Sequence, residues 1–148
     1  MRTASWVILA IVAALTMLGS IASCNIAYRG AGDEQIGSET LSQVTAGNPQ
    51  RAIALRARRG TAAAYAAGFA ALFLAITIGP YRRGDAWAWW ALLAGTVVMS
   101  AMILLRVPLL DTRLGAGAGL ITLVVVGLAL ALDAGRLRSG VRSAAPPS

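Results

Sequence analysis

The residue types that usually carry enzyme chemistry are scarce in this chain. Its 148 residues include no histidine, one cysteine and six acids, against 13 basic residues that are all arginine. Cys24 has no base near it in the sequence, and Asp85, Asp111 and Asp133 each lie at the edge of an apolar stretch. Nucleophilic, acid–base and metal chemistry all need several such groups to converge. We therefore expect a protein that is not an enzyme and that binds neither a metal nor a cofactor.

The charged residues all lie outside four apolar stretches, at residues 6–26, 61–79, 86–105 and 114–132. Each stretch has about 20 uncharged residues, which as a helix cross a hydrocarbon core of about 30 Å. None has the polar face of a soluble helix, and 57% of the whole chain is hydrophobic. The sequence predicts an all-α, polytopic membrane protein whose residues 1–148 form a single four-transmembrane-helix bundle.

A polar segment, residues 27–48, separates the first two stretches and contains three of the six acids. We expect a long polar loop there, exported from the cytoplasm, with one helical turn near residues 38–44. Its length exceeds an ordinary connection, so it is a lid, a partner-binding loop or a mobile segment. The tail, residues 137–148, contains Pro-Pro-Ser and is expected to be disordered.

The N-terminus has the form of an export signal, with Arg2 before an apolar run and small residues at its end. The sequence Ile-Ala-Ser-Cys at residues 21–24 fits a bacterial lipoprotein signal, which makes Cys24 a candidate lipidation and cleavage site. The alternative, which we favour, is an uncleaved first helix in which Cys24 is a small packing residue. Both interpretations export the segment that follows Cys24.

Four arginines mark the start of the second apolar stretch: Arg51, Arg56, Arg58 and Arg59. Asn48 is a good N-cap and Pro49 suits the first helical position, so one helix of about 30 residues is expected to begin there. We interpret the four arginines as a collar that binds lipid headgroups. The alternative, a site for an anion or a substrate phosphate, needs a converging partner that the sequence does not reveal.

The stretch GPYRRGDAWAWW, residues 79–90, combines helix breakers with charges and aromatic rings. Gly79 and Pro80 should end the second helix, and the Asp85 carboxylate should cap the third. Tryptophan and tyrosine rings settle between headgroups and acyl chains, and arginines reach lipid phosphates. We therefore predict a tight hairpin at a membrane face, with these interface residues: Tyr81, Arg82, Arg83, Trp87, Trp89 and Trp90.

With its glycine–proline stop, the run YRRGDAWAWWALLAG and a further apolar pair, the chain resembles small four-helix bacterial membrane proteins of the DoxX-like type. The resemblance covers about residues 60–136. It implies a four-helix fold in a bacterial membrane, and it transfers no catalytic residue to this chain.

Small residues at helical spacing predict where the helices pack. Gly115 and Gly119 have the GxxxG spacing that lets a second backbone approach, and Gly68 lies on a small-residue face of the second span. Packing within one bundle needs such faces, so they do not argue for an oligomer. Pro108 should prevent the third helix from continuing beyond residue 105.

The arginines divide almost evenly between the two sides of a four-span arrangement, six on the side of the termini and seven on the other. The positive-inside rule therefore does not decide the orientation. The export-like N-terminus, the basic short turn at residues 81–84 and the basic tail favour both termini on the cytoplasmic side of a bacterial inner membrane.

Membrane lipids are the expected partners, and the scattered arginines argue against nucleic acid because no basic face with interleaved exposed aromatics is formed. No span has an ionisable residue at its centre, which argues against a proton-coupled exporter. We expect a non-catalytic accessory or assembly subunit that docks to a larger membrane complex. The alternative is a protein that binds or transports a lipid or another small apolar molecule. The lack of polar residues inside the spans favours the accessory subunit.

Overall fold

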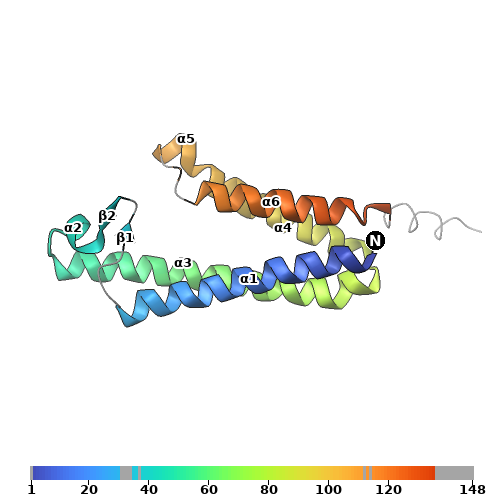
Figure 1. The fold of residues 1–148 in the computed structure, drawn as a ribbon, viewed down its shortest axis with the longest axis horizontal. Coiled ribbons are helices and arrows are strands. Elements are labelled where there is room, and N and C mark those ends of the chain that lie inside the picture. The colour runs from blue at the N-terminus through green and yellow to red at the C-terminus, as the bar shows by residue number, and fades with distance from the viewer. Residues whose placement is uncertain (1, 31–34, 37, 112, 114, 136–148) are drawn as a thin grey trace, which may run out of the picture. The chain divides into compact units, whose positions relative to one another are not determined.

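A computed structural model gives the fold of residues 2–30, 35, 36, 38–111, 113 and 115–135 (Figure 1). As expected, this part of the chain is mostly helical. Its one sheet is a hairpin of two strands with two residues each. The elements in chain order are α1 (Arg2–Arg29), β1 (Gln35–Ile36), β2 (Glu39–Thr40), α2 (Leu41–Thr45), α3 (Pro49–Ile76), the π-helical turn η1 (Thr77–Tyr81), α4 (Ala86–Leu104), α5 (Arg106–Leu110) and α6 (Ala116–Ala131).

Three helical segments are long and apolar enough to cross a membrane: Ala4–Arg29, Pro49–Tyr81 and Ala86–Leu110. In the most apolar 18-residue stretch of each segment, only 17%, 22% and 17% is buried inside the protein. Most of this apolar surface therefore needs a lipid environment. The chain is therefore that of a membrane protein. The fourth apolar helix, α6, has 16 residues, or about 24 Å at the helical rise, against a hydrocarbon core of about 30 Å. The tail expected at residues 137–148 lies outside the described residues.

The segment between the first two long helices has more structure than the sequence suggests. Helix α1 continues to residue 29, and β1 then pairs antiparallel with β2, Gln35 opposite Thr40 and Ile36 opposite Glu39. Helix α2 begins with a capping box, in which the Thr40 hydroxyl accepts a hydrogen bond from the Gln43 amide and the Gln43 side chain accepts one from the Thr40 amide. We name β1, β2, α2 and residues 46–59 the polar module.

The start of α3 is as predicted. The Asn48 side-chain oxygen accepts hydrogen bonds from the backbone amides of Gln50, at 3.0 Å, and Arg51, at 3.3 Å, while Pro49 occupies the first helical position. These bonds satisfy amides that have no partner inside the helix. Because α3 begins here, its arginines lie on a continuous helix that leads into the apolar stretch.

The prediction that Gly79 and Pro80 end this helix is wrong. The chain continues through η1, whose wider turn accommodates a proline without a backbone N–H to donate. The left-handed residue is Gly84, with a φ of 108°, and its amide donates to the Pro80 and Tyr81 carbonyls at 3.1 Å each. The helix therefore ends one turn later than expected.

Two further predictions about helix ends need correction. Asp85 occupies the N-cap position of α4, but its side chain makes no capping hydrogen bond. The chain is helical again around Pro108, which lies in the first turn of α5. Backbone N–H groups in the first turn have no acceptor within the helix, so proline, which has no N–H, is tolerated there. Only Leu105, in a turn conformation, separates α4 from α5.

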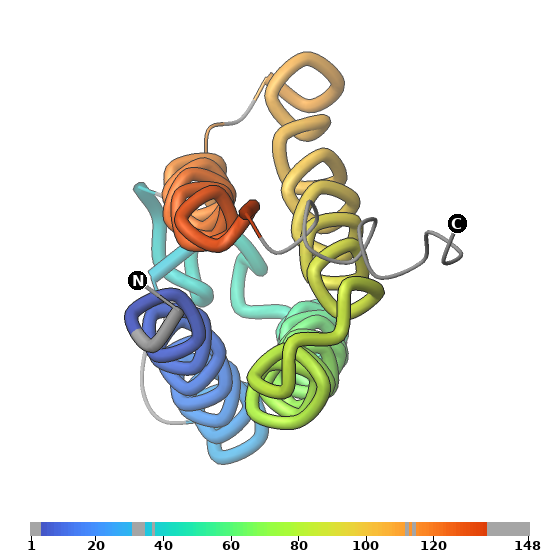
Figure 2. Tube along the Cα trace, turned by 90° about the vertical axis from the view of Figure 1, so that its right-hand side faces the viewer, coloured from blue at the N-terminus to red at the C-terminus, as the bar shows by residue number. Residues whose placement is uncertain are grey.

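The chain divides into two compact units, unit 1 with residues 1–13 and 72–148 and unit 2 with residues 14–71. In unit 1, α4 and α6 pack side by side (Figure 1). In unit 2, the second half of α1 runs beside the first half of α3 (Figure 2). Side-chain contacts of Cys24 with Gly60 and of Arg59 with Ser23 join the two helices there. The largest buried side chains all belong to unit 1: Tyr81, Leu9, Leu92, Leu130, Val126, Thr77, Thr96, Ser5 and Ser100.

Candidate functional site

A buried serine–tyrosine pair joins three segments of unit 1. Ser5 and Tyr81 are both fully buried, and their hydroxyl oxygens lie 2.6 Å apart. The Ser5 hydroxyl donates to the Ala129 carbonyl at 2.6 Å, so the Tyr81 hydroxyl donates to Ser5. The prediction that the Tyr81 ring lies at the lipid boundary is therefore wrong, because the π-helical turn carries it inside the unit.

Trp89 strengthens the same end of unit 1. Its indole N–H donates to the Leu130 carbonyl at 3.0 Å, and the ring is half-buried. The Leu130 carbonyl also accepts from the Asp133 amide at 3.1 Å, so the indole adds a second donor at the C-terminal end of α6 and ties α4 to it. We name these contacts of Ser5, Tyr81, Trp89, Ala129 and Leu130 the Ser5–Tyr81 network.

The remaining predicted interface residues of the 79–90 stretch have different environments. Trp87 and Trp90 are exposed, as an interfacial role requires, and Arg83 is exposed as well. The Arg82 guanidinium lies 5.0 Å from the centre of the Trp6 ring, at the distance of a cation–π contact. The stretch therefore contributes both packing residues and exposed residues.

Unit 1 has more polar side chains inside than the sequence analysis expected. Thr77 and Thr96 donate back to the carbonyls four residues earlier at 2.8 Å, and Ser100 donates to the Gly119 carbonyl of α6 at 3.3 Å. Asp133 is also buried, although it was expected at the membrane edge. The buried face of α4 consists of residues that recur every four positions: Ala88, Leu92, Thr96 and Ser100. This spacing is the feature of the sequence that could have identified the buried polar residues.

The three glycines predicted to mediate packing differ in their surroundings. A Cβ on Gly119 would lie 2.9 Å from Ile103 Cγ2, so only glycine allows α6 to approach α4 at this point. A Cβ on Gly68 or on Gly115 would meet nothing within 4 Å. Gly115 instead has a φ of 78° at the N-cap of α6, which explains a glycine there without a packing role.

The four arginines of α3 do not form a uniform collar. Arg51 and Arg58 are exposed, whereas the Arg59 Nε donates to the Ser23 hydroxyl of α1 at 3.0 Å. The Arg56 guanidinium lies against the end of α1, since a Cβ built on Gly30 would be 2.9 Å from its Nη1 atom. Two arginines therefore contact α1 while two remain available at the surface.

Cys24 lies within α1 and is half-buried, with its Sγ 3.7 Å from the Gly60 carbonyl oxygen. Its surroundings are those of a packing residue between α1 and α3. Gly60 permits this close approach, and an added Cβ there would lie 2.6 Å from the Tyr28 ring.

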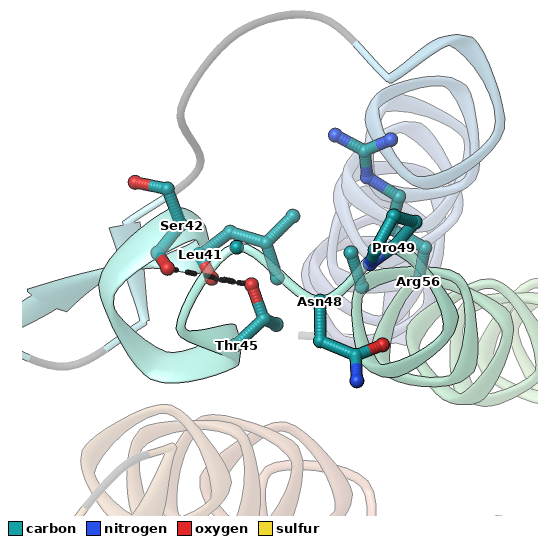
Figure 3. Close-up of a pocket in the computed structure, with 8 residues that line it drawn as sticks. Leu41, Ser42, Thr45, Asn48, Pro49 and Arg56 are labelled. Atoms are coloured by element: carbon teal, nitrogen blue, oxygen red, sulfur yellow. Dashed lines mark hydrogen bonds between the residues drawn. The ribbon is translucent and has the colours of Figure 1, made fainter.

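A pocket of about 220 Å³ lies in unit 2, where α2 leads into α3 (Figure 3). The residues that line it are Leu41, Ser42, Thr45, Gly47, Asn48, Pro49, Ala52 and Arg56. Arg56 was among the residues predicted from the sequence but the pocket was not, because the pocket depends on where α2 lies relative to α3. Among the residues that the structure describes, no group of three or more metal-ligating side chains comes together.

No protein-family model, curated protein or solved structure matches the chain.

Proposed function

We propose that this is a non-catalytic accessory or assembly subunit that docks to a larger membrane complex through its polar module. The observation that carries the proposal is that the polar module is folded and hydrogen-bonded, with two helix caps, while its arginines Arg51 and Arg58 face outward. A folded, charged surface suits recognition because little conformational entropy is lost when a partner binds.

The buried polar groups of unit 1 are compatible with a scaffold. Ser5, Thr77, Thr96 and Ser100 all donate to acceptors inside the unit. Thr77 and Thr96 bond to the preceding turn of their own helical segment. The bonds of Ser5 and Ser100 reach carbonyls of α6, and hydrogen bonds of this kind link helices in membranes, where the surrounding lipid offers no partner. They support a helix-packing role in place of a substrate-binding one.

The membrane arrangement within this proposal has four spans, with α6 as a short fourth span. A helix shorter than the hydrocarbon core is accommodated by local thinning of the bilayer. In this arrangement both termini lie in the cytoplasm of a bacterial cell, the protein lies in the inner membrane, and the polar module is exported.

The second candidate is a protein that binds a lipid or another small apolar molecule. The pocket at the α2–α3 junction favours it, because apolar atoms of residues such as Leu41, Pro49 and Ala52 form part of its wall. The two candidates differ in what remains bound after purification.

Co-purification tests the proposal. We would isolate the tagged full chain from native membranes in a mild detergent and quantify retained proteins and lipids. We expect one protein at a stoichiometric level, lost in Arg51→Glu and retained in Arg113→Glu, which reverses another exposed arginine outside the polar module. Glutamate is favourable in the first turn of a helix, so Arg51→Glu should leave α3 intact. Lipid without any stoichiometric protein would contradict the accessory-subunit proposal and support the second candidate.

A further inference from the structure

Arg56 differs from the other polar residues of the pocket because one of its donors has no acceptor. The Thr45 hydroxyl donates to the Leu41 carbonyl at 2.8 Å, and the Asn48 side-chain oxygen caps α3. The Arg56 Nε–H, in contrast, is buried and has no hydrogen-bond partner among the described residues. A buried donor on a charged group is costly to leave unpaired, which points to an acceptor supplied by a ligand.

The first-turn amides of α3 do not explain the site. Two of them already donate to Asn48, so the helix N-terminus has fewer free donors for an anion. The charge has to come from Arg56, which lines the pocket together with Pro49 and Ala52. Figure 3 shows the Arg56 side chain next to Pro49.

The position of Arg56 along α3 corresponds to the headgroup layer. The uncharged part of the helix begins at Gly60, four residues after Arg56, so Arg56 is about 6 Å outside the hydrocarbon core along the helix axis. The headgroup layer on each side of a bilayer is roughly 5–8 Å thick. The guanidinium is therefore at the depth of lipid phosphates.

The charge of unit 2 attracts an anion. The sequence of residues 14–71 has five arginines, at positions 29, 51, 56, 58 and 59, and three acids, at positions 33, 34 and 39, so arginines are in excess by two. Arginine is well suited to phosphate because its planar donors match two phosphate oxygens. Apolar wall atoms of Leu41, Pro49 and Ala52 can contact the carbon atoms that carry the phosphate.

We propose that the pocket at the α2–α3 junction binds one phosphate-bearing group through Arg56, either an anionic phospholipid headgroup or a free phosphate compound. A volume of about 220 Å³ is below the roughly 300 Å³ of the smallest drug-sized sites, which suits a headgroup or a small phosphate compound. This goes beyond docking to a partner, since it assigns a ligand class and a residue to one site.

Isothermal titration calorimetry on the full chain in a non-ionic detergent tests the site. The probes are a short-chain phosphatidylglycerol, a short-chain phosphatidylcholine and inorganic phosphate. We expect saturable binding of phosphatidylglycerol, weakened about tenfold or more in Arg56→Gln through loss of a charge-assisted hydrogen bond. Saturation by inorganic phosphate as well would identify a free phosphate compound as the source, and binding of phosphatidylglycerol alone would identify the lipid headgroup.

Two comparisons separate one site from a diffuse positive surface. Arg58→Gln removes the same charge two residues away but does not alter the pocket lining, so its effect should be several times smaller than that of Arg56→Gln. Ala52→Leu fills the pocket and keeps Arg56, and should also abolish binding, whereas Ala54→Leu on the exposed side of the same helix should not. Equal losses in Arg56→Gln and Arg58→Gln, unchanged binding in Ala52→Leu, or no binding of either anionic probe would overturn the proposal.

Discussion

The Ser5–Tyr81 network and the polar module are stabilised by different kinds of hydrogen bond. In the network, side-chain bonds join residues 76 and 124 positions apart. In the polar module, the side-chain bonds within the module, such as Thr45 to Leu41, join residues that are at most four positions apart, and the Arg59 bond to Ser23 of α1 is the long-range exception. Long-range bonds in an apolar interior fix distant segments together, whereas local bonds let a segment open by itself. Unit 1 is thus suited to be a scaffold, and the polar module is a folded surface that can open locally while that scaffold stays intact.

The largest loss of stability is expected from Gly119→Leu in unit 1. The new side chain would collide with Ile103 of α4, and overpacking of this kind costs about 2–3 kcal/mol. Thermal unfolding in detergent measures the effect. Gly117→Leu, on the same helix and with open space around it, is the control. Equal melting temperatures for the Gly119→Leu protein and the unchanged protein would disprove the close α4–α6 packing.

The next largest effect should come from the Ser5–Tyr81 network. Ser5→Ala removes both the acceptor of the Tyr81 hydroxyl and the donor to Ala129, at a cost of about 1–3 kcal/mol. Tyr81→Phe removes one of these bonds and should cost about 1 kcal/mol. The same melting experiment measures both variants. Tyr65→Phe, at a 78% exposed residue, should change nothing, and a cost for it equal to that of Tyr81→Phe would show that burial of the hydroxyl is irrelevant.

A smaller and more local effect is expected from Asn48→Ala in the polar module. Loss of an N-cap costs about 1 kcal/mol, and here it removes the acceptor of the Gln50 and Arg51 amides. Hydrogen exchange should accelerate at these amides while α4 and α6 keep their protection. Acceleration spread over α4 and α6 would mean that the polar module does not open independently.

The smallest effect is expected from Gly60→Ala in unit 2. An added Cβ would lie 2.6 Å from the Tyr28 ring, closer than the contact at Gly119, but Tyr28 is 69% exposed and its ring can move. Alanine is also a better helix former by about 1 kcal/mol, which offsets the adjustment. We expect a change in unfolding free energy near zero, measured by thermal unfolding. A loss as large as that of Gly119→Leu would show that unit 2 is as rigidly packed as unit 1.

The existence of the helices and the start of α3 could be predicted, because apolar length and an Asn-Pro N-terminus are local signals. The buried faces of the helices could not be predicted in this way. A helix that is apolar on all sides has no periodic pattern that shows which side is buried. Tyr81 illustrates this: the same ring suits a lipid boundary or a buried hydrogen bond, and the π-helical turn at Pro80 decides between them.

The candidate sites show the same limit. Arg56 and Arg58 look alike in the sequence, yet Arg58 is exposed and Arg56 borders a pocket against Gly30. The difference depends on where α2 lies relative to α3, which no local pattern in the sequence reveals. For the same reason the spacing of Gly115 and Gly119 predicted two packing glycines, whereas in the structure Gly119 packs against α4 and Gly115 is the N-cap of α6.

Cysteine labelling tests most directly whether a membrane-embedded scaffold carries a water-exposed polar module. In a Cys24→Ala background, Val44→Cys and Val98→Cys place one thiol on α2 and one on α4, at side chains that are 39% and 63% exposed in the structure. The protein is reconstituted into permeabilised liposomes and treated with a charged maleimide, with labelling in denaturing detergent as the reference for both. We predict rapid labelling of Val44→Cys and almost none of Val98→Cys, because lipid covers the more exposed position. Equally fast labelling of Val98→Cys would contradict the account.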